Sequence, residues 1–322
     1  MKIDPATLTM IGVDLKRPEC VLCLRSGDVF ACHMGSGIVR IRPDGRQETI
    51  GSFEQVDGDP WIPNGIAILP DRTFLIANMG PGGGVWRLDL DGNLSPFLRE
   101  ADGEVLAGTN FVYTDNQNRT WVTVTTRQKT LQNAFRPGVA DGYVVLIEGG
   151  KARIVADGIA FANELRVDAH GSFLYLVETM KRQITRFAIQ PNGDLGEPEV
   201  FATFGHGTFP DGFAFDAEGC LWVTSVVTNR LIRVSPDGSP TIVLEDSDPA
   251  HTDKIEEDIA AGALVREDIQ RQAGKVLKNI SSIAFGGPDC RTVYLGSLGG
   301  GEIPSFRSPV PGAMPVHWEY TL

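Results

Sequence analysis

The sequence has no long apolar run and no cluster of basic residues. No uninterrupted apolar stretch approaches the roughly 18–20 residues that a membrane-spanning helix needs. Acidic residues outnumber basic ones by 41 to 29, which gives a formal net charge of −12. Because phosphate backbones and anionic lipid headgroups repel such a chain, we expect neither nucleic acid nor a membrane surface among its partners.

Cysteine is also scarce, with five residues spread over the whole chain. An odd number of distant cysteines does not suit a disulfide scaffold. Cys20 and Cys23 could form half of a zinc or redox site, but no second cysteine or histidine pair completes it, and buried thiols are the simpler interpretation. The first residues, MKIDPATLTM, have neither the apolar stretch nor the cleavage site of a signal peptide. We therefore expect a cytoplasmic protein.

Turn-forming residues, in contrast, are abundant: the 322 residues include 37 glycines and 20 prolines. Disorder does not explain this excess, because 42% of the residues are hydrophobic and only 22% are charged. Such a chain can bury a large core. Its length would suit two domains, or one all-β propeller or barrel.

A unit of about 48 residues recurs along the chain. Each unit opens with a polar residue, followed by a short apolar strand, a Gly/Asp/Asn turn and a second β-rich strand. We call the opening residues the anchors; they are Glu19, Asn64, Asn110, Asn163, Asp211 and Ser281. A second hairpin turn follows in the first five units, for example Asp44-Gly45 and Asp237-Gly238. Each anchor therefore opens four short strands.

Six four-stranded units of this period predict an all-β fold, a six-bladed β-propeller that forms one domain over residues 1–322. A β-sandwich is the alternative. Either Leu8–Val13 or Val316–Tyr320 should complete the sixth blade. The last interval between anchors is the longest, and residues 245–275 read as a helical insertion between blades five and six.

Within the insertion we expect a helix over Asp253–Gln272, opened by a capping box formed by Asp253 and Glu256. The loops that lead into the first strands lie on the same face of the propeller as the anchors. The insertion could therefore be a lid over a central site or an excursion that contacts another subunit.

The anchors predict a metal site. The first strand of each blade lines the central channel of a propeller, so the anchors should form a ring. All six carry side-chain oxygen atoms, which are costly to bury unless something satisfies them. A divalent cation would do so: Ca²⁺ fits best, with Mn²⁺, Mg²⁺ or Zn²⁺ as alternatives. The other interpretation is that the anchors only cap the turns into their strands.

Four segments carry a resemblance to a known family. They are PEC at Pro18–Cys20, FAN at Phe161–Asn163, PDGFAFDAEGCLWV at Pro210–Val223 and SSIAFGG at Ser281–Gly287. Together they resemble the senescence-marker-protein/gluconolactonase family, also called regucalcin-like. The resemblance implies a six-bladed propeller and, for many members, metal-dependent hydrolysis of sugar lactones.

The resemblance also implies roles for single residues. The metal-binding Glu, Asn and Asp of the family fall on Glu19, Asn163 and Asp211, and Asn110 matches an Asn that contacts the metal or its water. The sequence departs from the family where Glu164 replaces the Gly of an Asn-Gly pair. It departs again at Gly108, where some sugar lactonases have a substrate-binding Arg.

Hydrolysis of a lactone requires an activated water and a stabilised oxyanion. We expect Asp211 to act as general base as well as ligand, with Glu19 as the alternative. His206, Arg127, Asn64 and His33, together with Asn110, are the candidates for substrate binding, although isolated loop residues of these types are often simply solvated.

These residues predict a metal-dependent lactonase similar to gluconolactonase, acting on a sugar-derived or other small lactone. An esterase or phosphotriesterase on the same metal site is the nearest alternative. A non-catalytic Ca²⁺-binding propeller is the alternative outside enzymes.

Overall fold

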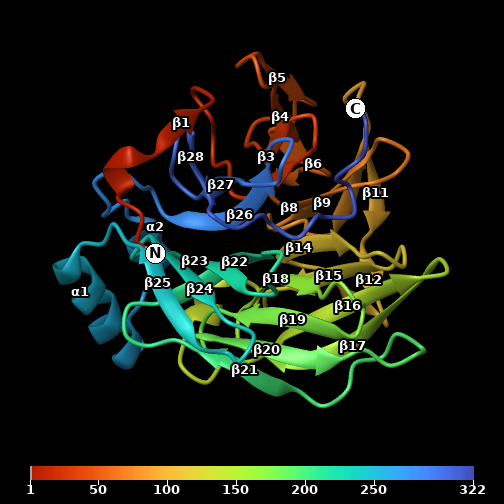
Figure 1. Cartoon of the computed structure of the whole chain (residues 1–322). Helices are drawn as coiled ribbons and strands as arrows, with labels where there is room; N and C mark the ends of the chain where they lie inside the picture. The colour runs from red at the N-terminus through yellow and green to blue at the C-terminus, as the bar shows by residue number, and fades with distance from the viewer. Residues whose placement is uncertain (1) are drawn as a thin grey trace.

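The computed structural model describes residues 2–322 and contains six four-stranded antiparallel sheets arranged around a common centre (Figure 1). From the inside outwards, blade one consists of β2 (Val21–Cys23), β3 (Val29–Cys32), β4 (Ile38–Ile41) and β5 (Gln47–Ile50). Blade two consists of β8 (Pro63–Ile68), β9 (Phe74–Asn78), β10 (Val85–Leu88) and β11 (Leu94–Leu98). Blade three consists of β14 (Thr109–Thr114), β15 (Thr120–Val124), β16 (Gly142–Glu148) and β17 (Lys151–Ile159).

The remaining blades follow the same order. Blade four consists of β18 (Ala162–Val167), β19 (Phe173–Glu178), β20 (Gln183–Ala188) and β21 (Glu199–Thr203). Blade five consists of β22 (Phe209–Phe215), β23 (Leu221–Val226), β24 (Arg230–Val234) and β25 (Pro240–Leu244). Blade six consists of β26 (Ile280–Gly286), β27 (Thr292–Ser297), β28 (Ile303–Arg307) and β1 (Thr9–Ile11).

The inner strands close a ring. β2, β8, β14, β18, β22 and β26 contact one another in this order, and β26 also contacts β2. Blades of this kind bury both faces against their neighbours, which is why the inner strands are apolar on both sides. The predicted six-bladed β-propeller is therefore confirmed.

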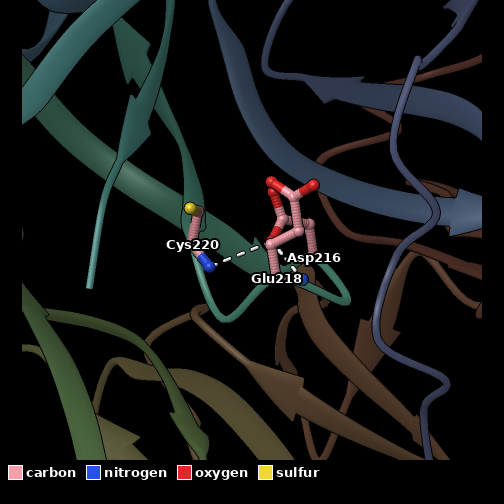
Figure 2. Close-up of side chains that lie close together, drawn as sticks. All are labelled: Asp216, Glu218 and Cys220. Atoms are coloured by element: carbon pink, nitrogen blue, oxygen red, sulfur yellow. Dashed lines mark hydrogen bonds between the residues drawn. The ribbon is translucent and has the colours of Figure 1, made fainter.

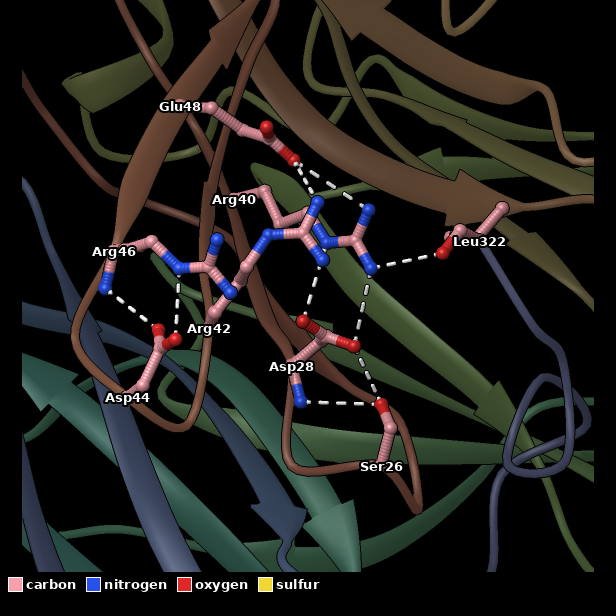
Figure 3. A network of polar contacts seen from close by, with 8 residues as sticks. All are labelled: Ser26, Asp28, Arg40, Arg42, Asp44, Arg46, Glu48 and Leu322. Atoms are coloured by element: carbon pink, nitrogen blue, oxygen red, sulfur yellow. Dashed lines mark hydrogen bonds and ion pairs between the residues drawn. The ribbon is translucent and has the colours of Figure 1, made fainter.

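The N-terminal segment completes the sixth blade, because β1 pairs with β28 and sets Thr9 opposite Ser305. The C-terminal segment lies along blade one instead, where the Arg25 amide donates to the Trp318 carbonyl. Figure 3 shows that Arg40 holds this end too: its guanidinium donates to the Leu322 carbonyl at 2.9 Å and pairs with a buried Asp28.

The hairpin turns behave as their sequences predict. Gly45 and Gly238 have φ angles of +84° and +86°, a region that favours glycine. In blades three and five, an aspartate also stabilises the hairpin between the first and second strands. Its carboxylate accepts from a tryptophan indole: Asp115 from Trp121 and Asp216 from Trp222, each at 2.9 Å.

A β-bulge occurs at the anchor in five of the six inner strands. Pairing with the second strand shifts between Pro63 and Ile66, Thr109 and Phe111, Ala162 and Leu165, Pro210 and Phe213, and Ile280 and Ile283. A bulge inserts one extra residue and re-aims side chains. It can therefore turn an anchor and its successor toward the channel together.

The insertion between blades five and six is helical, but its helices differ from the expected one. It contains α1 (Pro249–Ala260) and α2 (Arg266–Gln270) rather than one helix over Asp253–Gln272. The N-cap of α1 is Asp248, not Asp253, and its carboxylate accepts from the Ala250 and His251 amides. The helix ends because Gly262, with φ +66°, follows its C-cap and closes a Schellman motif.

Smaller elements join the blades: the 3₁₀ helices η1 (Pro5–Thr7) and η2 (Leu131–Phe135), and hairpins of β6 (Gln55–Val56) with β7 (Asp59–Pro60) and of β12 (Glu100–Ala101) with β13 (Glu104–Val105).

All five cysteines are free and buried. Over residues 2–322, no helix combines the length and apolar character needed to cross a membrane.

Candidate metal centre

Five of the six anchors line one small cavity at the end of the channel. Glu19, Asn64, Asn110, Asn163 and Asp211 surround a volume of about 60 Å³. The sixth anchor, a serine, is buried outside this lining and donates its hydroxyl hydrogen to the Glu19 carbonyl at 2.9 Å. Ring closure thus brings together residues that are as many as 192 positions apart, because each begins an inner strand.

Two of these five anchors, Asn64 and Asn110, are joined to each other and to neighbouring residues by hydrogen bonds. The Asn64 carbonyl oxygen accepts from Arg17 at 2.6 Å, and its amide donates to the Asn110 backbone carbonyl at 2.9 Å. The Asn110 amide in turn donates to Thr125 at 3.1 Å. These two asparagines therefore form a chain of hydrogen bonds along the cavity wall.

Two other anchors, Glu19 and Asn163, each have a side-chain oxygen atom that accepts no hydrogen bond from the described residues. Glu19 Oε2 and Asn163 Oδ1 are buried and have no hydrogen-bond partner within residues 2–322. The Asn163 amide nitrogen donates to Thr179 at 3.1 Å, which leaves its carbonyl oxygen free. Asp211 lines the same cavity, so three oxygen-bearing side chains face one space.

The electrostatics of the cavity point to a cation. Burial raises the pKa of Glu19 from 4.5 to about 7, and the charge of Glu164 adds to this effect. Burial and the charges of Glu19 and Glu164 also raise the pKa of Asp211 well above its usual value. Buried carboxylates at this density are costly unless a positive charge compensates them, so the donor set fits a hard divalent ion.

A third carboxylate, Glu164, does not line the cavity, but its charge raises the pKa of Glu19 and of Asp211. From the sequence it is only a departure from the family. Its Oε2 atom accepts from Arg166 at 3.0 Å and from the Phe213 amide at 3.3 Å, whereas its buried Oε1 atom has no partner among the described residues. A Cβ atom on Gly212 would lie 2.5 Å from Oε1, which places this carboxylate against the residue that follows Asp211. A charged residue directly after an anchor, at a position where the family has Gly, is the sequence signal that could have revealed it.

The helical insertion forms part of the cavity wall. Arg266, Ile269 and Gln270 of α2 line it, together with apolar side chains of η2. Gln132 of η2 holds α2 in place: it donates to the Leu264 carbonyl at 2.6 Å and accepts from the Arg266 amide at 2.8 Å. We call residues 249–270, which include α1 and α2, the cap.

Residues 18–245 match the model of the SMP-30/gluconolactonase/LRE-like region. The chain belongs to this family. Its propeller superposes on a gluconolactonase from Xanthomonas campestris with a TM-score of 0.67 and 17% identity, covering 95% of this chain and 90% of that one. It superposes on the calcium-binding protein regucalcin from Agrobacterium tumefaciens with a TM-score of 0.66 and 17% identity, covering 98% of this chain and 95% of that one.

Curated relatives match over shorter stretches. The 6-deoxy-6-sulfogluconolactonase of Pseudomonas putida is 26% identical over 149 residues, 46% of this chain and 41% of that protein. The strictosidine synthase-like 10 protein of Arabidopsis thaliana is 27% identical over 178 residues, 53% of this chain and 42% of that protein. The matches thus span about two fifths of the length of these relatives.

In this member of the SMP-30/gluconolactonase/LRE-like family, three of the expected substrate-binding residues lie outside the cavity lining. His33 contacts a serine of its own turn at 3.0 Å. Arg127 makes a two-pronged ion pair with Asp157 at 2.7 and 2.9 Å. His206 lies 3.3 Å from Asp253 of α1. Of the five candidates, the structure therefore brings only Asn64 and Asn110 to the cavity.

A second group of possible metal ligands lies at the turn between β22 and β23. Figure 2 shows Asp216, Glu218 and Cys220 side by side there. The Asp216 carboxylate already accepts from the Glu218 and Cys220 amides, the Trp222 indole and the Arg233 guanidinium. Since these contacts are those that hold the hairpin together, this cluster has a structural role.

Proposed function

We propose that the protein is a divalent-metal-dependent hydrolase that opens a sugar-derived or other small lactone. The observation that carries this proposal is a pair of buried oxygen atoms on Glu19 and Asn163 that have no hydrogen-bond partner within residues 2–322 and line the same cavity as Asp211. Membership of the family and the lactonase names of relatives support a small lactone as the substrate.

Glu19, Asn163 and Asp211 would hold the cation, and Asn110 would contact it directly or through a water. Oxygen donors with two carboxylates suit Ca²⁺ first, and Mn²⁺, Mg²⁺ or Zn²⁺ in competition with it. The calcium-binding regucalcin that shares this fold supports the same preference. When bound, the ion would polarise the lactone carbonyl and stabilise the negative charge that develops on its oxygen.

Asp211 would take a proton from the attacking water, with Glu19 as the alternative base. A carboxylate that works near neutral pH needs a pKa raised from its ordinary value, and burial raises the pKa of both residues. The cap would exclude bulk water from the side of the cavity that α2 and η2 line.

We also infer that residues 1–322 act as one domain, since β1 from one end of the chain completes the sheet formed near the other. Five free buried thiols suit a reducing compartment such as the cytoplasm.

A panel of lactones and esters, assayed with purified protein and elemental analysis, tests the proposal. We expect lactone hydrolysis that is lost on chelation and restored by one divalent ion per chain. Asp211→Asn should abolish turnover while the circular dichroism spectrum stays unchanged. Hydrolysis that persists after the metal has been removed would overturn the proposed mechanism.

A further inference from the structure

Two arginines line the cavity of the candidate metal centre beside its carboxylates. Arg17 donates to the Pro63 carbonyl at 3.1 Å and to Asn64 at 2.6 Å, and its Nε atom is buried without a partner. Arg266 of the cap is half-buried, and its backbone amide donates to Gln132. Within the part of the chain that the structure describes, the Arg266 guanidinium has neither a hydrogen-bond acceptor nor an ion-pair partner.

Arg166 pairs with Glu164 at 3.0 Å, and neither residue lines the cavity, so the lining holds two carboxylates, Glu19 and Asp211, and two guanidinium groups, Arg17 and Arg266. A divalent cation held by the two carboxylates would compensate their charge and leave the two arginines uncompensated. Arg17 already donates to two oxygen atoms, whereas Arg266 has no anion from the residues that the structure describes. A charge that is partly buried is costly without a partner, so an anionic group on the substrate would stabilise Arg266.

The rest of the lining is mostly apolar. Its apolar members are Met79, Leu131, Phe135, Phe161, Met180, Phe209, Val226, Ile269 and Leu298. Phe135 and Phe161 stack with their ring centroids 5.1 Å apart. Outside the anchors and the arginines, only Thr179 and Gln270 offer polar side chains. This wall has few partners for the several hydroxyls of a sugar lactone.

We propose that the substrate is a lactone with an apolar ring and one oxyanion substituent, and that Arg266 of the cap binds this substituent. The planar guanidinium fork matches a carboxylate or another oxyanion through two parallel hydrogen bonds. Because Arg266 lies on α2, binding of the anion also holds the cap closed over the reacting carbonyl. The position of the lactone in this inference rests on the proposed function, whereas the binding of the anion rests on Arg266 alone.

Calorimetry with non-hydrolysable lactams tests the inference without turnover. The probes are 5-oxoproline, its sulfonate counterpart and its neutral amide, each titrated into the Ca²⁺-loaded protein. We expect the wild type to prefer the anions over the amide by about tenfold or more, a typical loss when one charge-assisted contact is removed. Arg266→Gln should erase this preference and leave affinity for the amide unchanged, and Arg266→Lys should retain part of it.

Arg271→Gln is the matched control, because this exposed arginine lies one position beyond α2 and outside the cavity lining. It should behave as the wild type. Comparison of 5-oxoproline with its sulfonate counterpart identifies the oxyanion that fits better. A preference for anions that survives intact in Arg266→Gln would overturn the inference, because the anion would then be bound by the metal or by Arg17.

The two proposals fail separately. If Arg266 controls anion binding but no lactone is hydrolysed, the anion site stands and the proposed function fails. If lactones are hydrolysed and the charged and neutral forms bind equally well to the wild type, the proposed function stands and the anion site fails.

Discussion

The metal-free protein should lose stability as the pH rises, and Glu19 allows the size of the effect to be worked out. Burial raises the pKa of Glu19 from 4.5 in an unfolded chain to about 7 in the folded one. Between these values the folded state retains a proton that the unfolded state releases. The free energy of unfolding therefore falls as the pH rises through this window. The shift is worth about 3 kcal/mol, at 1.36 kcal/mol for each pH unit.

Urea unfolding of the chelated protein at pH 5 and pH 8, followed by tryptophan fluorescence, measures this loss. The wild type should lose about 2–3 kcal/mol more than Glu19→Gln between the two conditions, because at pH 5 the unfolded chain has already released most of this proton; this is roughly 3–4 °C in Tm for a chain of this length. The charge of Glu19 also raises the pKa of Asp211, and Glu19→Gln removes this effect as well. The difference in stability loss between the wild type and Glu19→Gln should therefore be at least this large. Excess Ca²⁺ should reverse the loss at pH 8, because an ion that binds only the folded state stabilises it.

Glu197→Gln serves as the control, since this carboxylate is exposed on the surface and distant in sequence from every anchor. It should follow the wild type at both pH values. Equal pH dependence in the wild type and in Glu19→Gln would refute the reasoning, because it would mean that Glu19 is solvated or already compensated in the metal-free protein.

Three further predictions concern catalysis, the cap and the blades. Asp211→Asn should lower kcat by about 100-fold or more, the usual size of a lost general base, with unchanged circular dichroism; full activity would exclude this role. Gln132→Ala removes two hydrogen bonds to the cap, so limited proteolysis within residues 261–265, located by mass spectrometry, should accelerate several-fold. An unchanged cleavage rate would mean that apolar packing alone closes the cap. Trp222→Phe leaves Asp216 without its indole donor and should cost about 1–3 kcal/mol in urea unfolding; a smaller loss would mean that Arg233 suffices.

The repeat could be predicted from the sequence because its signals are local. A glycine at a position with positive φ, such as Gly45, or a carboxylate that accepts from its own hairpin, such as Asp216, depends on residues a few places away. The start of α1 was predicted wrongly although its signal was also local: Asp248 followed by Pro249 is a strong helix opening, and Asp253 lies inside the first two turns.

Closure of the ring could not be read in the same way. The segments around Thr9 and around Trp318 both have β-forming character, and only the position of β28 decides which of them pairs. The same holds for Arg266, whose segment is a short helix in a long insertion. Nothing within that segment shows that it will lie over Asp211.

The sequence alone therefore determined the propeller and the identity of the side chains at the start of each blade, because turns and short strands form through contacts between near neighbours. The tertiary structure alone decided what these side chains do. Asn64 and Asn163 are the same residue type at equivalent positions. The side-chain oxygen of Asn64 accepts a hydrogen bond from Arg17, whereas that of Asn163 has no partner within residues 2–322. Partners from distant blades decide which oxygens remain available, and only the closed ring brings those partners together.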